Sequence, residues 1–135
     1  MLKDMATRCC KEKGCNCGES TLLAASEQYG LGLTEEDAKL MGGFGGGLGS
    51  GLTCGALLAS ASVLGKLVLT GPAHSCPGFR KLCGEYAAAF KETMGGTNCA
   101  ELRPVYFVRG EGCVRAIQKN AELLEAFIEE HELAK

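Results

Sequence analysis

The sequence has no tryptophan, and among its 135 residues it has only two histidines and three prolines. Neither His74 nor His131 is near a candidate nucleophile in the chain, so no nucleophile–base–acid triad is predicted. The glycine-rich run 42–51 contains no Gly-x-Gly-x-x-Gly, and Gly65-Lys66 is followed by leucine instead of serine or threonine. The sequence therefore lacks the usual nucleotide-binding loops, and no enzymatic reaction is assigned from it.

The sequence also lacks a strong excess of one charge, with 14 basic and 16 acidic residues and a net charge of −2. This balance gives no general attraction to nucleic acid or to an anionic membrane, and we predict neither as a partner. The first eight residues contain no apolar signal segment, which predicts a cytoplasmic location. The apolar stretch 54–69 is short for a membrane span and contains Lys66, so we interpret it as a buried helix.

Glycine and cysteine are abundant, with 20 and 9 residues respectively. Nine is an odd number, so the cysteines cannot all form pairs within one chain, and structural disulfides are rare in a reducing compartment. No two cysteines have the Cys-x-x-Cys spacing, which disfavours a zinc ribbon and a thioredoxin-like dithiol. The composition favours a metal, cluster or redox role for the cysteines.

The spacing of apolar residues predicts a single all-α domain over residues 1–135. It should be a compact bundle of five to six helices around a central small-residue helix, with the glycine-rich loop folded over the cysteine site. Helices are expected at 2–13, 16–29, 35–43, 53–69, 77–94 and 113–132, with Pro77 as a first helical residue. Residues 98–102 should form one turn that Pro104 ends, and the β-like run 105–108 is too isolated to make a sheet.

Four cysteines each follow a turn and precede a predicted helix: Cys17, Cys54, Cys99 and Cys113. The first N–H groups of a helix have no partner within it and carry partial positive charge, so a thiolate there is stabilised. This placement indicates four thiolates gathered for chemistry, with Cys15 as a possible additional ligand. The alternative is that these cysteines are small buried apolar residues. Cys83 is expected in the core, and the roles of Cys9, Cys10 and Cys76 are left open.

The four cysteines and the glycine-rich lead-in carry a resemblance to a known family. Asn16-Cys17, Cys54-Gly55-Ala56, Asn98-Cys99 and Cys113 resemble the pattern of the C_GCAxxG_C_C family of small redox-active proteins. The resemblance covers about residues 14–127, and it departs from the motif at Ala59, where the family has glycine. It implies redox activity, without a defined reaction or substrate.

These observations favour an iron–sulfur cluster bound by Cys17, Cys54, Cys99 and Cys113, serving electron transfer with an unidentified redox partner. A metal-free thiol–disulfide protein and a zinc or soft-metal protein without redox turnover remain open. We also predict a homodimer, because helix 113–132 has an apolar stripe widened by Leu123 and Phe127, and helix 53–69 has a side of small residues.

Overall fold

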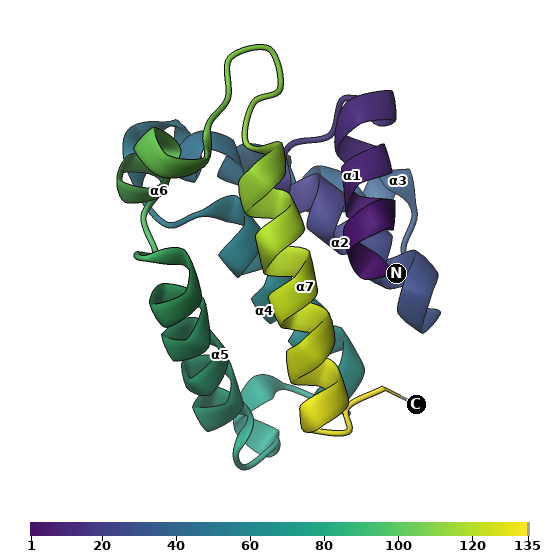
Figure 1. The fold of residues 1–135 in the computed structure, drawn as a ribbon. Coiled ribbons are helices and arrows are strands. Elements are labelled where there is room, and N and C mark those ends of the chain that lie inside the picture. Colours follow the sequence, from purple (N-terminus) through teal and green to yellow (C-terminus); the bar gives the residue numbers. More distant parts are fainter. Residues whose placement is uncertain (135) are drawn as a thin grey trace.

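A computed structural model describes residues 1–134, and it confirms the predicted all-α class. The described part of the chain forms no β-sheet and is built from seven α-helices (Figure 1). Their bounds are α1 Leu2–Lys13, α2 Cys17–Tyr29, α3 Glu35–Ala38, α4 Gly55–Val68, α5 Phe79–Met94, α6 Cys99–Tyr106 and α7 Val114–Glu130. A 3-10 segment, Lys39–Phe44, continues α3. No helix within these residues is both long and apolar enough to cross a membrane.

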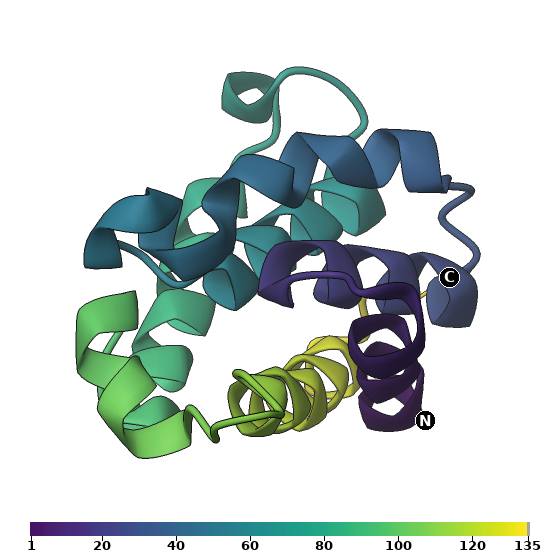
Figure 2. The same ribbon diagram turned by 90° about the horizontal axis from the view of Figure 1, so that it is seen from above.

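Helix α4 is central and packs against α2, α5 and α7 (Figures 1 and 2). Its most buried side carries small residues, including Ala56, Ala59 and Ser60, all fully buried. Small residues let the axis of α2 come close: a Cβ on Gly18 would lie 3.5 Å from the Gly55 carbonyl oxygen. This close crossing places the first residues of α2 and α4 side by side.

A hydrogen-bonded network fixes α4 to α5 and α7 in the core. The Tyr86 hydroxyl donates to Asn120 Oδ1 at 2.6 Å, and Asn120 Nδ2 donates to Ser60 Oγ at 3.1 Å. Ser60 in turn donates to the Ala56 carbonyl at 2.8 Å, within the first turn of α4. All four residues are buried, and an unpaired polar group there would cost free energy, so the network specifies how these helices meet.

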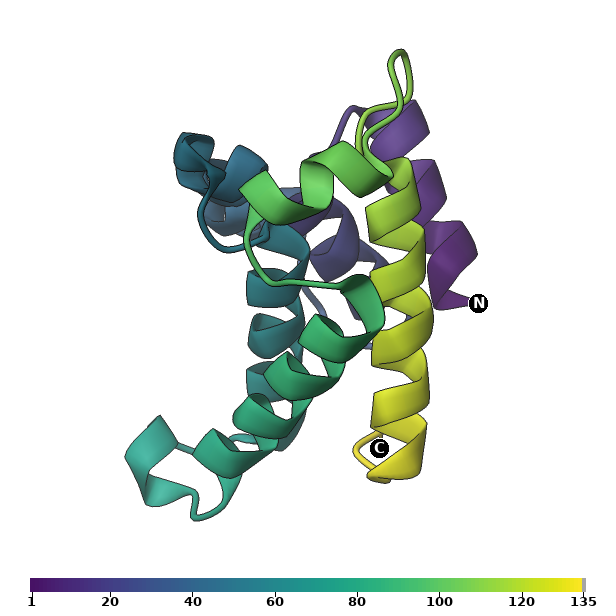
Figure 3. The same cartoon turned by 60° about the vertical axis from the view of Figure 1, so that its left-hand side comes forward.

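The glycine-rich segment before α4 contains a left-handed turn. Gly46, Gly47, Leu48 and Gly49 have φ values of 64°, 62°, 64° and 65°. Glycine adopts this conformation freely, whereas another residue loses about 1–2 kcal/mol, so only Leu48 carries the cost. The left-handed backbone of this turn therefore explains why the run is rich in glycine. The turn lies beside α6 (Figures 2 and 3).

Pro77 was expected to begin a helix and Pro104 to end one, but neither proline does so. Residues 76–79 form a Pro-Gly β-turn, in which Gly78 has φ 86° and the Phe79 amide donates to the Cys76 carbonyl at 3.3 Å. Pro77 is therefore a turn residue, and α5 begins two residues later. Pro104 lies inside α6, which continues to Tyr106 because the Tyr106 hydroxyl anchors the last turn to the Met94 carbonyl at 2.8 Å.

The β-like run 105–108 makes no sheet, as predicted. Its first two residues complete α6, and Val108 makes only an isolated bridge with Gly112. That bridge closes a tight hairpin between α6 and α7, with N–H to carbonyl distances of 2.8 and 2.9 Å. The hairpin fixes the residues that lead into Cys113.

The apolar faces that suggested a dimer are used within one chain. Phe127 is buried and makes an edge-to-face contact with Tyr86, with 5.0 Å between the ring centroids. The small residues of α4 are buried against other helices of the same chain, as described above. The dimer itself stays a prediction, and these two features no longer argue for it.

Candidate functional site

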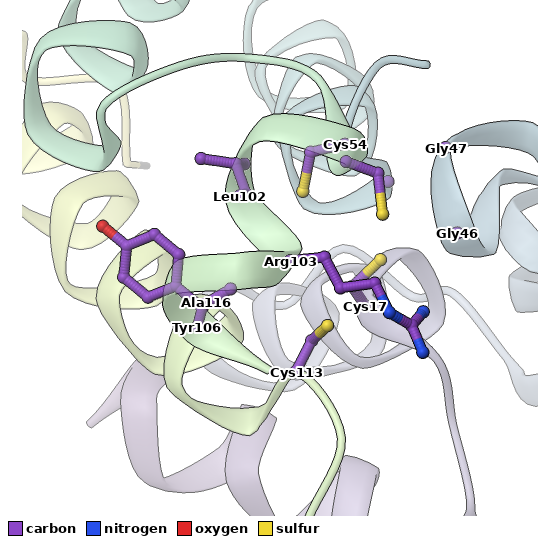
Figure 4. A pocket seen from close by; sticks show the side chains of 11 residues that line it. Cys17, Gly46, Gly47, Cys54, Leu102, Arg103, Tyr106, Cys113 and Ala116 are labelled. Carbon is purple, nitrogen blue, oxygen red and sulfur yellow. The ribbon is translucent and has the colours of Figure 1, made fainter. Parts of the chain in front are cut away.

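Four cysteines at the starts of four helices line one pocket (Figure 4). Cys17 and Cys99 are the first residues of α2 and α6, and Cys54 and Cys113 directly precede α4 and α7. The cavity measures about 60 Å³, several times the 10–15 Å³ or so that one water needs. Its other lining residues are Gly46, Gly47, Gly55, Leu102, Arg103, Tyr106 and Ala116.

Two of these helix starts are built by the same local sequence, Asn-Cys-x-Glu. In α2 the Glu19 amide donates to Asn16 Oδ1 at 2.9 Å, and the Asn16 amide donates to the Glu19 carboxylate at 3.0 Å. In α6 the Asn98 amide donates to the Glu101 carboxylate at 3.1 Å. The capping is reciprocal in α2, whereas in α6 the Glu101 amide donates to the Asn98 main-chain carbonyl at 2.9 Å. In both helices the carboxylate fixes the helix start, and therefore the backbone of the cysteine that follows the asparagine.

Backbone hydrogen bonds join the start of α4 to the start of α6. The Cys54 amide donates to the Thr97 carbonyl at 2.8 Å, and the Cys99 amide donates to the Leu52 carbonyl at 2.6 Å. The segment before α4 and the segment before α6 thus run side by side through two main-chain bonds. Cys54 and Cys99 are held next to each other without any contribution from their side chains.

Two glycines are required by the close approach of neighbouring atoms. A Cβ on Gly55 would lie 2.7 Å from Cys17 Sγ and 2.9 Å from the Phe44 carbonyl oxygen. A Cβ on Gly47 would lie 2.3 Å from the Leu52 carbonyl oxygen and 2.8 Å from the Cys99 Cβ. Real Cβ atoms do not come this close, so any larger residue would displace a pocket cysteine or the backbone beside it.

Cys17 and Cys54 form a hydrogen-bonded thiol pair whose two acidities differ. The hydrogen bond from Cys17 lowers the pKa of Cys54 to about 7, and the amides of Ala56 and Leu57 favour the same thiolate against the effect of burial. The same bond, together with burial, raises the pKa of Cys17 well above its usual range. Of the two thiols, Cys54 at the start of α4 is therefore the one that loses its proton first.

This acidity predicts a thiolate near neutral pH in the reduced, metal-free protein. We expect ultraviolet thiolate absorbance to rise with a midpoint near pH 7, well below the usual thiol value of 9.0. Because the unfolded chain keeps this proton until about pH 9, Cys54 favours folding increasingly from pH 7 to 9, and this contribution is lost as the pH falls through 7. Cys17→Ala removes the donor and should raise the midpoint. A wild-type protein without thiolate until the pH approaches 9 would contradict the pair.

Arg103 is a site residue that the sequence analysis missed. It lies one helical turn after Cys99 in α6, and its side chain extends past Cys17 and Cys113 in Figure 4. Burial raises the pKa of Cys113, as does the nearby Cys99, and the Arg103 guanidinium opposes this effect. Its i, i+4 spacing from Cys99 was visible in the sequence, but Pro104 led us to end that helix early.

The remaining cysteines lie outside the pocket lining. The Cys15 amide donates to the Cys9 carbonyl at 3.3 Å, at the junction of α1 and α2. Burial raises the pKa of Cys9, Cys10 and Cys15. Cys83 was expected in the core but is half-buried, because α5 buries Tyr86, Phe90 and Met94 while its first turns remain partly exposed.

The pocket sulfurs are gathered around a space and do not converge on one point. Within residues 1–134, no three cysteine, histidine, aspartate or glutamate side chains form a group that would hold a single metal ion. A structural zinc ion needs four ligands, with Zn–S distances of about 2.3 Å. The arrangement instead offers separate thiols around a shared cavity.

Comparison with known proteins supports a redox role. A family model described as "Putative redox-active protein (C_GCAxxG_C_C)" matches residues 15–127. An uncharacterized protein of Archaeoglobus fulgidus is 33% identical over 100 residues, which make up 66% of this chain and 66% of that protein. The chain thus spans slightly less than two thirds of that relative. No solved structure matches the sequence.

Proposed function

The chain belongs to the C_GCAxxG_C_C family, and from its redox description and the four-cysteine pocket we propose a redox protein that binds an iron–sulfur cluster. Cys17, Cys54, Cys99 and Cys113 would hold the cluster. The observation that carries the proposal is that four thiols, each at a helix start, line one cavity. When bound, such a cluster supplies oxidation and reduction by single electrons.

The donor set fits an anionic cluster in its chemistry. Four cysteine thiolates are the usual ligands of [2Fe–2S] and [4Fe–4S] clusters. The helix dipoles of α2, α4, α6 and α7 present their positive ends to the pocket, and Arg103 adds a full positive charge at its lining. These charges offset the negative charge that four thiolates and sulfide would bring together.

The spread of the sulfurs favours a cluster over one zinc ion. A single tetrahedral ion requires all four thiolates at one centre, and the described side chains form no such group. In a cluster the thiolates bind different iron atoms, so they lie farther apart. The apolar lining from Leu102, Tyr106 and Ala116 would limit solvent around the bound group, which is one of the factors that set its potential.

The hydrogen-bonded pair supports a second candidate, a metal-free thiol–disulfide protein. The Cys54 thiolate would attack a partner disulfide, and Cys17 would then resolve the mixed disulfide. The pair would lose two electrons and the Cys17 proton as it forms its own disulfide, and the partner disulfide would take up both electrons and become one thiol and one thiolate. This mechanism needs Cys17 and Cys54 but gives Cys99 and Cys113 no part.

Anaerobic purification followed by iron and acid-labile sulfide analysis tests the proposal. We expect a brown protein that contains iron and sulfide in similar amounts. A colourless protein without iron, in which a thiol pair titrates with two electrons, would replace the cluster with the second candidate. Zinc without sulfide would favour the single-ion site.

A further inference from the structure

An exposed apolar surface borders the cysteine pocket. Leu48 and Leu52 of the glycine-rich segment are 48% and 52% exposed, and Phe107 at the end of α6 is 40% exposed. The glycine-rich segment packs directly against α6, because a Cβ placed on Gly51 would lie 3.1 Å from the Cβ of Ala100. Figure 3 shows the segment, α6 and the following hairpin together at one end of the molecule.

Leu48 lies on this surface in a backbone conformation that is unfavourable for any residue other than glycine. It is the one non-glycine residue in the left-handed turn, with φ 64°, and its side chain makes the turn more strained than glycine would. Exposure of the side chain means that core packing does not explain its presence. A strained residue with an exposed apolar side chain beside a pocket is characteristic of a functional contact.

Three arginines border this surface. Arg103, Arg109 and Arg115 are exposed, and within residues 1–134 none forms an ion pair with a carboxylate. The arginines outnumber the two acids of the same segment: Glu101 accepts hydrogen bonds at the start of α6, and Glu111 pairs with Lys11 at 3.8 Å. The chain as a whole carries −2, so this positive region differs in sign from the whole protein.

We propose that this surface is the docking site of an electron-transfer protein with an acidic face around its own redox centre. The docking surface consists of Leu48, Leu52, Arg103, Phe107, Arg109 and Arg115. The proposal rests on the redox function proposed above, and it adds where and what the partner contacts. The arginines attract the acidic face, and the apolar side chains exclude water beside the pocket. One electron then passes between the two redox centres, and no bond forms or breaks.

Equilibrium binding to an acidic flavodoxin, measured with the cofactor-loaded protein, tests the surface. Raising the ionic strength from 0.01 to 0.15 M shortens the screening length from about 30 Å to about 8 Å, so the affinity should fall steeply. The double variant Arg109→Glu/Arg115→Glu should bind about tenfold more weakly at low salt. The matched control Arg80→Glu alters an exposed arginine of α5, away from this surface, and should bind like wild type.

Leu48→Gly separates docking from folding. Glycine relieves the left-handed strain, so the melting temperature should stay equal or rise, while binding to flavodoxin weakens severalfold. Wild-type binding by both the double variant and Leu48→Gly would overturn the proposal. So would tighter binding to a basic cytochrome c, to nucleic acid or to anionic vesicles than to flavodoxin. Iron and sulfide are measured in each variant, so loss of the cofactor is distinguished from loss of docking.

Discussion

Cys54→Ser and Cys17→Ser should each lower the bound iron to a small fraction of the wild-type value. Both side chains line the pocket and contact each other, so either change removes one of the four thiolates and disturbs a second. Serine is close in size but remains a protonated alcohol near neutral pH, and it is a poor ligand for iron in a cluster. Iron and acid-labile sulfide per chain, after anaerobic purification, give the measurement.

Cys83→Ser is the matched control for these two variants. Cys83 is half-buried in a groove between α4 and α5 and takes no part in the pocket lining. Its iron and sulfide content should equal that of wild type. Undiminished iron in the Cys54→Ser protein would refute the ligand assignment, and equal losses in all three variants would indicate a general effect on folding.

Gly55→Ala should abolish cofactor retention although it adds only one methyl group. The new Cβ would lie 2.7 Å from Cys17 Sγ and 2.9 Å from the Phe44 carbonyl oxygen, so α2 or α4 must move. Overpacking of this kind usually costs about 1–3 kcal/mol, and here the displaced atom is itself a pocket sulfur. We expect a lower free energy of unfolding and iron close to zero.

Gly84→Ala provides the comparison, since Gly84 is also helical but has no atom within 4 Å of its ideal Cβ. Alanine there should stabilise the protein by about 0.5–1 kcal/mol and leave iron unchanged. Denaturant unfolding and metal analysis of the two variants separate a helix-propensity effect from a site effect. If Gly55→Ala behaved like Gly84→Ala, the close contact with Cys17 would be wrong.

The placement of the pocket cysteines at helix starts was visible in the sequence because turn signals and apolar spacing are local. Cys17 and Cys99 follow capping asparagines, and these signals alone locate the beginnings of α2 and α6. The same reasoning failed at Pro104, since a hydroxyl from the end of α6 reaches the Met94 carbonyl and sustains the helix. Such a tertiary contact leaves no periodic trace in the sequence.

The pairing of Cys17 with Cys54 could not be predicted from spacing. It depends on how closely α2 crosses α4, which is set by Gly18 and Gly55 acting together. The left-handed conformation of Leu48 was likewise hidden, because leucine rarely adopts a positive φ and nothing in the sequence marks this one. The acidity of Cys54 and the position of Arg103 follow from these three-dimensional arrangements.

The four pocket cysteines are distributed along most of the chain, from Cys17 to Cys113. A group bound to all of them would act as a cross-link that closes a loop of roughly 100 residues. In the chain-entropy model, such a cross-link stabilises the folded state by about 4.7 kcal/mol. Because every helix that contributes to the pocket belongs to a different part of the sequence, this cross-link can form only after the last helix has packed in place. Maturation of the site would then report completion of the whole fold.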